Sequence, residues 1–166
     1  SEPVFDSPQR FVEYLLPQAQ EAADQLGIAP EALLAQAALE TGWGRSVIHG
    51  STGNSHNLFG IKADQRWHGE QVRKDTLEFQ DGVATKVRAP FRAYDSYAES
   101  FRDYAEFVSG QPRYRDAVAA DNPRDYFRAL QQAGYATDPQ YADKVLNILD
   151  RDELKLVSAA GRATRG

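Results

Sequence analysis

The chain has 166 residues, of which 42% are hydrophobic and 11% are aromatic, so it can form one domain with a sizeable core. Its formal net charge of -5 argues against a nucleic-acid partner held through phosphate contacts. The absence of cysteine excludes disulfides and thiolate metal sites. No apolar run approaches the roughly 20 residues of a membrane span, so we expect no membrane insertion. The N-terminal stretch SEPVFDSPQR lacks the basic and apolar parts of a signal peptide.

Two helices are predicted in the first part of the chain. Ser7 precedes a proline, which is typical of an N-cap, and apolar residues then recur with a helical period over 8–26 until Gly27 predicts a stop. The second helix is predicted over 30–41, with Gly42 as its C-terminal glycine. This helix is apolar on most sides, which indicates a central buried position.

The middle of the chain predicts a small β-lobe over about 58–91. Residues 50–57 have the composition of a loop. The segments 70–79 and 83–91 alternate between apolar and polar residues, and the Gln-Asp-Gly sequence between them is a hairpin signal. We therefore expect an antiparallel hairpin inserted between helices.

The last third of the chain predicts further helices, with caps at Asp95 and at Asp138. Their expected ranges are 95–109, 113–120, 123–133 and 138–152. The small and basic residues 153–166 predict a disordered tail. The expected organisation is one α+β domain over 1–152, with a mainly helical lobe and an antiparallel hairpin lobe.

The sequence ALETGWG places a single carboxylate, Glu40, at the end of the apolar second helix. Apolar neighbours and the negative end of the helix both favour the protonated form, whereas water entering past the following glycines opposes it. Glu40 is therefore either a proton donor or a helix-ending glutamate that points into solvent.

A glycosidase also needs a second carboxylate or an assisting substrate amide. The predicted β-lobe offers Glu70, Asp75, Glu78 and Asp81. We favour Glu78 because it lies near the end of a strand, just before the turn, where it can face a cleft between the lobes. The alternative is an ordinary exposed charge on a strand.

Aromatic rings can stack on sugars or fill the core. Six are candidates for a sugar cleft: Trp43, Trp67, Tyr94, Tyr97, Tyr135 and Tyr141. We place Trp43 and Tyr135 in the cleft, Trp43 because it lies beside Glu40 between two glycines. Asn57 either binds substrate or fixes the loop that follows it, and Phe59 is predicted to be in the core.

Neither a metal nor another cofactor is expected. The three histidines, His49, His56 and His68, lack the i, i+4 spacing of a helical metal pair, and HExxH does not occur. The glycines at 42 and 44 do not form a phosphate-binding loop, because the third glycine and a preceding strand are missing.

Five sequence blocks, in order, resemble a known family. The blocks are ALETGWG at 38–44, NLFGIK at 57–62, TLEFQDG at 76–82, FRAYDSY at 91–97 and GYATDPQYA at 134–142. Together they resemble the peptidoglycan β-N-acetylglucosaminidases of glycoside hydrolase family 73, and within it the hydrolase domains of flagellar rod proteins. The resemblance covers roughly residues 8–150 and implies a lysozyme-like fold with a cleft between an α-lobe and a β-lobe.

The resemblance also implies roles for individual residues. Glu40 matches the general acid of the family, and Glu78 matches a second acid that serves as a base or positions water. Tyr135 matches a tyrosine near the cleaved bond. A route assisted by the 2-acetamido group of the substrate stays open. We expect substrate-binding residues at Trp43, Asn57, Tyr97 and Tyr141.

The function implied by the resemblance is hydrolysis of the β-1,4 bond between N-acetylglucosamine and N-acetylmuramic acid in the periplasm, which opens the cell wall for flagellar rod assembly. The expected partners are peptidoglycan glycan strands, and flagellar rod proteins through a part outside this chain. One alternative is a muramidase or lytic transglycosylase on the same fold. Another is a noncatalytic peptidoglycan-binding module.

Overall fold

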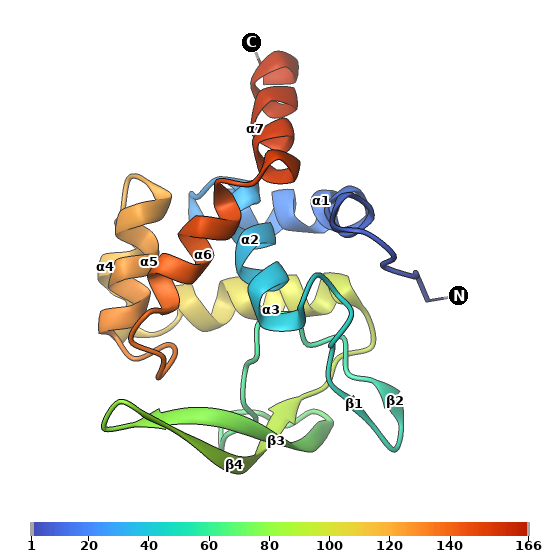
Figure 1. The fold of residues 1–166 in the computed structure, drawn as a ribbon, viewed down its shortest axis with the longest axis vertical. Coiled ribbons are helices and arrows are strands. Elements are labelled where there is room, and N and C mark those ends of the chain that lie inside the picture. Colours follow the sequence, from blue (N-terminus) through green and yellow to red (C-terminus); the bar gives the residue numbers. More distant parts are fainter. Residues whose placement is uncertain (1, 166) are drawn as a thin grey trace.

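The structure, a computed structural model, describes residues 2–165 and has the predicted α+β organisation (Figure 1). Its helices are α1 Pro8–Leu26, α2 Pro30–Thr41, α3 Tyr97–Ser109, the short 3-10 helix η1 Pro112–Tyr114, α4 Arg115–Val118, α5 Pro123–Gln132, α6 Tyr141–Leu149 and α7 Asp152–Arg165. Its strands are β1 His49–Gly50, β2 Gly53–Asn54, β3 Gln71–Gln80 and β4 Val83–Arg92. The strands form two separate two-stranded antiparallel sheets.

The helical lobe is built around α2, which packs against α1, α6 and α7. Most side chains of α2 are buried, as its apolar sequence predicts. The Ser7 side chain caps α1 by accepting a hydrogen bond from the Arg10 backbone N–H at 3.1 Å. Gly27 ends the helix in a left-handed conformation. These observations confirm the predicted bounds of the first two helices.

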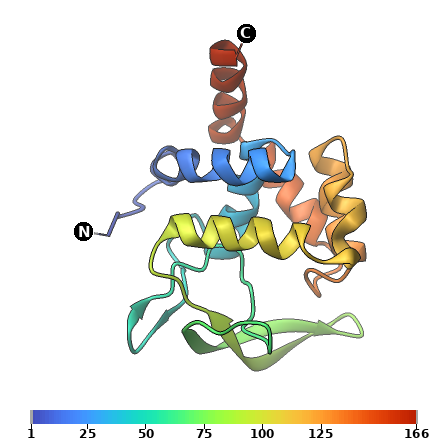
Figure 2. The same ribbon diagram turned by 180° about the vertical axis from the view of Figure 1, so that it is seen from behind.

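The β-lobe consists mainly of the long β3–β4 hairpin, which lies at the opposite end of the molecule from α7 (Figure 2). The register pairs Gln71 with Arg92 at the base and Gln80 with Val83 at the tip. The two loop residues have φ of 54° and 80°, as the Asp-Gly turn predicts. A β-bridge between Lys62 and β4 ties the hairpin base to the preceding segment.

Three local features differ from the sequence prediction. The segment 50–57, which was expected to be a loop, contains the end of β1 and all of β2, and these two strands pair as a small antiparallel hairpin. The N-cap of α3 is Ser96 rather than Asp95, because the Ser96 hydroxyl accepts the Glu99 backbone N–H. Helix α6 begins only at Tyr141, and Asp138 instead accepts the backbone N–H of Gln140, which forms a turn before the helix.

The chain also differs from the predicted disordered tail over 153–166. Helix α7 extends to Arg165, and its Leu154 side chain is fully buried in the core of the helical lobe. This apolar anchor accounts for the helical start of the segment, and Gly166 lies outside the described residues. Among residues 2–165, no helix is both long enough and apolar enough to cross a membrane.

Candidate active site

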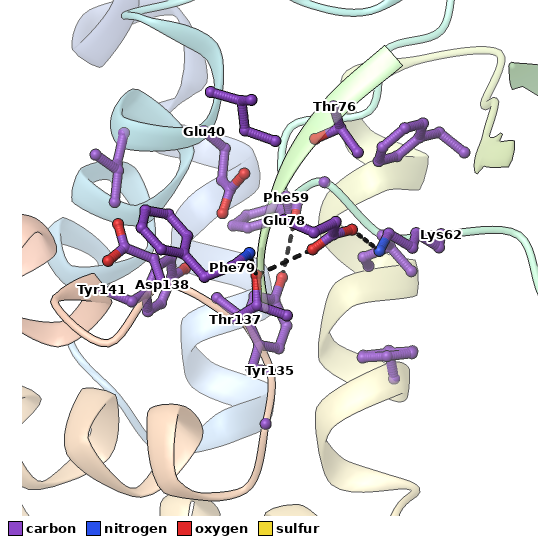
Figure 3. Close-up of a pocket in the computed structure, with 18 of the residues that line it drawn as sticks. Glu40, Phe59, Lys62, Thr76, Glu78, Phe79, Tyr135, Thr137, Asp138 and Tyr141 are labelled. Carbon is purple, nitrogen blue, oxygen red and sulfur yellow. Dashed lines mark hydrogen bonds and ion pairs between the residues drawn. The ribbon is translucent and has the colours of Figure 1, made fainter. Parts of the chain in front are cut away.

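A cavity of about 520 Å³ lies between the helical lobe and the β3–β4 hairpin. Its walls include the last turn of α2, the segment 59–62, the middle of β3 and the loop 134–138 before α6. Figure 3 shows side chains from these segments gathered around one space. Segments that are far apart in the sequence therefore meet here, at the boundary of the two lobes.

Glu40 lies in the last turn of α2 and lines this cavity (Figure 3). The helix stops directly after it because Gly42 takes a left-handed conformation with φ of 55°. Gly60 faces the carboxyl so closely that an added Cβ would lie 2.8 Å from Glu40 Oε2. With φ of 64°, Gly60 is also in a conformation that side chains rarely adopt. A glycine at position 60 therefore avoids a steric clash with the Glu40 carboxyl.

The pKa of Glu40 is raised from 4.5 to about 7. The main cause is desolvation by the surrounding protein atoms. The nearby Tyr141 hydroxyl lowers the pKa, and the negative charge of Glu78 raises it further. Glu40 is nevertheless exposed by its accessible surface, because the cavity that it lines is open, so its proton is accessible to a bound molecule. A large fraction of Glu40 is protonated near neutral pH, as a proton donor requires.

Glu78 projects from β3 on the other wall of the same cavity (Figure 3). Its carboxylate forms an ion pair with Lys62 and accepts a hydrogen bond of 3.0 Å from the Thr137 hydroxyl. The same hydroxyl accepts the backbone N–H of Phe79 at 2.9 Å. Thr137 thus joins the hairpin to the loop before α6 and holds Glu78 at the cavity.

The other acidic candidates of the β-lobe do not line the cavity within the described residues. Asp75, for example, is directed to cross-strand partners on β4, with ion pairs of 3.6 Å to Lys86 and 3.4 Å to Arg88. The structure therefore brings together Glu40 and Glu78, and leaves Glu70, Asp75 and Asp81 outside.

Tyr135 and Tyr141 both line the cavity, and their ring centroids are 5.9 Å apart. The Tyr135 hydroxyl donates to the backbone carbonyl of Phe59 at 2.8 Å, which fixes the segment opposite Glu40. Burial raises the pKa of both tyrosines well above the ordinary value, so both hydroxyls are neutral. They can hydrogen-bond or contact a sugar, but they do not act as bases.

Two predicted substrate-binding rings lie elsewhere, outside the described lining of the cavity. The Trp43 ring packs edge-on against Phe11, and the Arg151 guanidinium lies 4.8 Å from its centroid. The ring of Tyr97 packs against Phe5 in the core of the helical lobe. The sequence neighbour of Glu40 thus contacts α1 rather than the cleft, because the chain turns at the end of α2.

Asn57 is buried and all of its side-chain hydrogen-bonding capacity is used inside the protein. Its amide donates to the carbonyls of Ile61 and Arg92, each at 2.9 Å. Its oxygen accepts the backbone N–H groups of Phe59 and Ile61. Of the two predicted roles for Asn57, this geometry favours fixing the loop over binding substrate. Phe59 is buried in the core, as predicted.

Two residues of the site were not predicted from the sequence. Thr137 contacts the backbone and a side chain of β3, 58 or 59 residues away, and nothing in the local sequence indicates that pairing. Gly60 had a signal, since a glycine between apolar residues indicates a turn or a close approach. No group of three or more potential metal ligands occurs in the part of the chain that the structure describes.

Comparison with known proteins gives the same family from the sequence and from the fold. A family model described as mannosyl-glycoprotein endo-β-N-acetylglucosaminidase, a glucosaminidase model, matches residues 16–154. The peptidoglycan hydrolase FlgJ of Vibrio parahaemolyticus is 49% identical over 150 residues, which are 90% of this chain and 49% of that protein. FlgJ of Pseudomonas aeruginosa is 47% identical over 98% of this chain and 42% of its own length. The chain spans about half the length of these relatives.

Solved structures of peptidoglycan hydrolases are similar to this chain in both sequence and fold. The peptidoglycan hydrolase from Sphingomonas sp. A1 has a TM-score of 0.81 and 43% identity, over 92% of this chain and 94% of that chain. The glycoside hydrolase domain of Salmonella typhimurium FlgJ has a TM-score of 0.70 and 35% identity, over 96% of this chain and 94% of that chain. These similarities confirm the predicted lysozyme-like α+β fold. The chain belongs to the glucosaminidase family of glycoside hydrolases.

Proposed function

We propose that this domain is a peptidoglycan hydrolase of the endo-β-N-acetylglucosaminidase type, which cleaves the β-1,4 bond between N-acetylglucosamine and N-acetylmuramic acid. The observation that carries the proposal is the pairing of Glu40, with its raised pKa of about 7, with Glu78 across one cavity. Family membership and the names of the relatives support the choice of bond and polymer.

Glu40 acts as the general acid in this proposal. Its proton passes to the oxygen that links the two sugars as the bond from C1 of N-acetylglucosamine to that oxygen breaks. Positive charge develops at C1, and the departing N-acetylmuramic acid residue leaves with a hydroxyl group. Water then adds to C1 and gives one proton to Glu78. The cycle closes when Glu78 releases that proton to solvent and Glu40 takes one up from solvent.

Glu78 serves as the base in this scheme because its carboxylate faces the cavity from the opposite wall. The ion pair with Lys62 and the Thr137 hydroxyl fix its orientation. The ring of Tyr135 forms part of the cavity wall near Glu40, where it can contact the sugar at the cleaved bond. Tyr141 lines the same wall and interacts with the Glu40 carboxyl.

We infer the biological role from the resemblance to flagellar rod proteins, and the relatives named FlgJ support it. We place the enzyme in the periplasm, where it opens the peptidoglycan layer for assembly of the flagellar rod. Its substrate is the glycan strand of peptidoglycan. We assign contact with rod proteins to no residue of this domain, which spans about half the length of the FlgJ relatives.

Digestion of purified peptidoglycan sacculi tests the proposal. The wild-type domain is expected to clear the suspension and to release fragments that mass spectrometry identifies by a reducing-end N-acetylglucosamine. A folded Glu40→Gln variant keeps the side-chain shape without the proton donor, and it is expected to release almost none. Reducing-end N-acetylmuramic acid would indicate a muramidase, an anhydro product a transglycosylase, and binding without any release a noncatalytic module.

A further inference from the structure

Gln36 is a polar side chain that is fully buried in the core of the helical lobe. It lies one turn before Glu40 on α2, so the two residues share a face of the helix. A buried amide costs free energy unless its donors and acceptor are paired. An apolar side chain at position 36 would avoid this cost. The hydrogen-bond partners of the Gln36 amide therefore indicate its role.

The oxygen of Gln36 accepts a hydrogen bond of 2.7 Å from the Tyr104 hydroxyl on α3. The same hydroxyl lies 2.5 Å from the Tyr126 hydroxyl on α5. Tyr104 has one proton and gives it to Gln36, so Tyr126 must donate to Tyr104. This chain of hydroxyls has a direction, and it turns the Gln36 amide nitrogen away from Tyr104.

On the other side of Gln36 lies Tyr141, the first residue of α6. Its hydroxyl and the Gln36 amide nitrogen are both buried, and neither makes a hydrogen bond within the described part of the chain. Burial and the Glu40 charge raise the pKa of Tyr141, while the nearby Gln36 amide lowers it. Helix α6 packs against α2, and Tyr141 lines the cavity together with Glu40, so Tyr141 lies where it can connect Gln36 with Glu40.

We propose that Gln36 is a positioning residue that fixes the direction of a buried hydrogen-bond chain from Tyr126 through Tyr104, Gln36 and Tyr141 to Glu40. Gln36 donates to the oxygen of Tyr141, and Tyr141 in turn donates to the carbonyl oxygen of the Glu40 carboxyl. The acidic proton of Glu40 then sits on its other oxygen, where it can face the cavity. This inference rests on the proposed role of Glu40 as general acid.

Reversing the direction of the hydrogen-bond chain would place the acidic proton of Glu40 differently. If the Gln36 amide were turned over, its oxygen would accept from Tyr141, and the oxygen of Tyr141 would accept the proton of Glu40. The proton would then point into the core and away from a substrate. The two directions also differ in their effect on Glu40, because a donor stabilises the carboxylate and an acceptor stabilises the acid.

A pH titration of the carbon-13 NMR signal of the Glu40 carboxyl distinguishes the two directions and needs no enzyme activity. The signal is assigned because it is missing from the spectrum of Glu40→Gln. Tyr141→Phe is expected to raise the pKa of Glu40 by about one unit, since a donor to the carboxylate is lost. Gln36→Leu is expected to raise it similarly, and the double variant no further, because both changes break one chain. A lower pKa in Tyr141→Phe, or no change in a folded Gln36→Leu or Gln36→Met, overturns the proposal.

Kinetics supply the second readout. Gln36→Leu and Tyr141→Phe are expected to lower kcat about tenfold, with KM changed less than about twofold, and to move the alkaline limb of the pH profile upward. Tyr126→Phe is the matched control: it removes a buried hydroxyl at the far end without reversing Tyr104, and its alkaline limb should stay in place. A shift in that control equal to that of Gln36→Leu would indicate general loosening of the core and overturn the proposal. If the wild type cleaves no peptidoglycan, the proposed function fails, and the carbon-13 titration still decides this inference.

Discussion

The two walls of the cavity are built in different ways. On the helical wall, Glu40 is carried by α2, whose side chains are mostly buried and whose neighbours are α1, α6 and α7. On the hairpin wall, Glu78 is carried by a two-stranded ribbon whose exposed residues include Leu77 and Val83, at 66% and 64% exposure. One carboxyl is carried by a buried helix, and the other is carried by an exposed hairpin and held by side-chain contacts.

This difference separates two requirements of the reaction. The helical wall fixes the position of the proton donor and raises its pKa through burial. On the hairpin wall, the second carboxylate is held by an ion pair with Lys62 and a hydrogen bond from Thr137. Substitutions on the helical wall should change the chemical step, whereas substitutions on the hairpin wall should also change substrate binding.

The largest effect is expected for Glu40→Gln. Loss of the general acid should lower kcat by about 10²–10⁴-fold while the fold is retained. The matched control is Glu31→Gln at the start of the same helix, which should keep activity. Turnover of soluble glycan strands, measured as new reducing ends, checks both. A folded Glu40→Gln variant with most of its activity would remove Glu40 from the mechanism.

A smaller loss is expected for Glu78→Gln, about 10- to 100-fold in kcat, since the base is lost but the acid stays. Asp75→Asn on the same strand is the control, because Asp75 faces its cross-strand partners and not the cavity. If Glu78→Gln kept its activity within about threefold, the group that assists the reaction at C1 would be the 2-acetamido group of the substrate and not Glu78.

The smallest loss is expected for Thr137→Val, which removes hydrogen bonds to Glu78 and to the Phe79 backbone without changing the side-chain shape. We expect kcat/KM to fall about three- to tenfold, the size of one or two ordinary hydrogen bonds. Thr85→Val, on β4 of the same hairpin, provides the control. Equal effects of the two substitutions would show that the link between hairpin and loop has no part in catalysis.

Most of the fold could be predicted because its signals are local. Ser7 and Gly27 mark the ends of α1, and the Asp-Gly pair marks the hairpin turn, each through the backbone conformation it favours. The cap of α3 and the tail were predicted less well. Two adjacent polar residues, Asp95 and Ser96, could both cap a helix, and burial of Leu154 depends on distant neighbours.

The residues of the candidate site likewise differ in how far the sequence could predict them. Glu40 and Glu78 were selected from their positions in the sequence together with the family resemblance, and the structure brings both to one cavity. Trp43 shows the limit of that reasoning, since closeness in sequence to Glu40 does not determine where its ring points. Gln36 and Thr137 make hydrogen bonds to elements that lie far away in the sequence, so only the structure could reveal them.

The pH dependence of kcat/KM tests the central claim most directly, because it follows the ionisation of the free enzyme. A general acid must be protonated, so activity should fall as the pH rises through the Glu40 pKa of about 7. Because the charge of Glu78 raises that pKa, the alkaline limb of Glu78→Gln should lie at lower pH than that of the wild type. An alkaline limb near 4.5, or one that Glu78→Gln does not move, would contradict the proposed pairing of the two carboxyls.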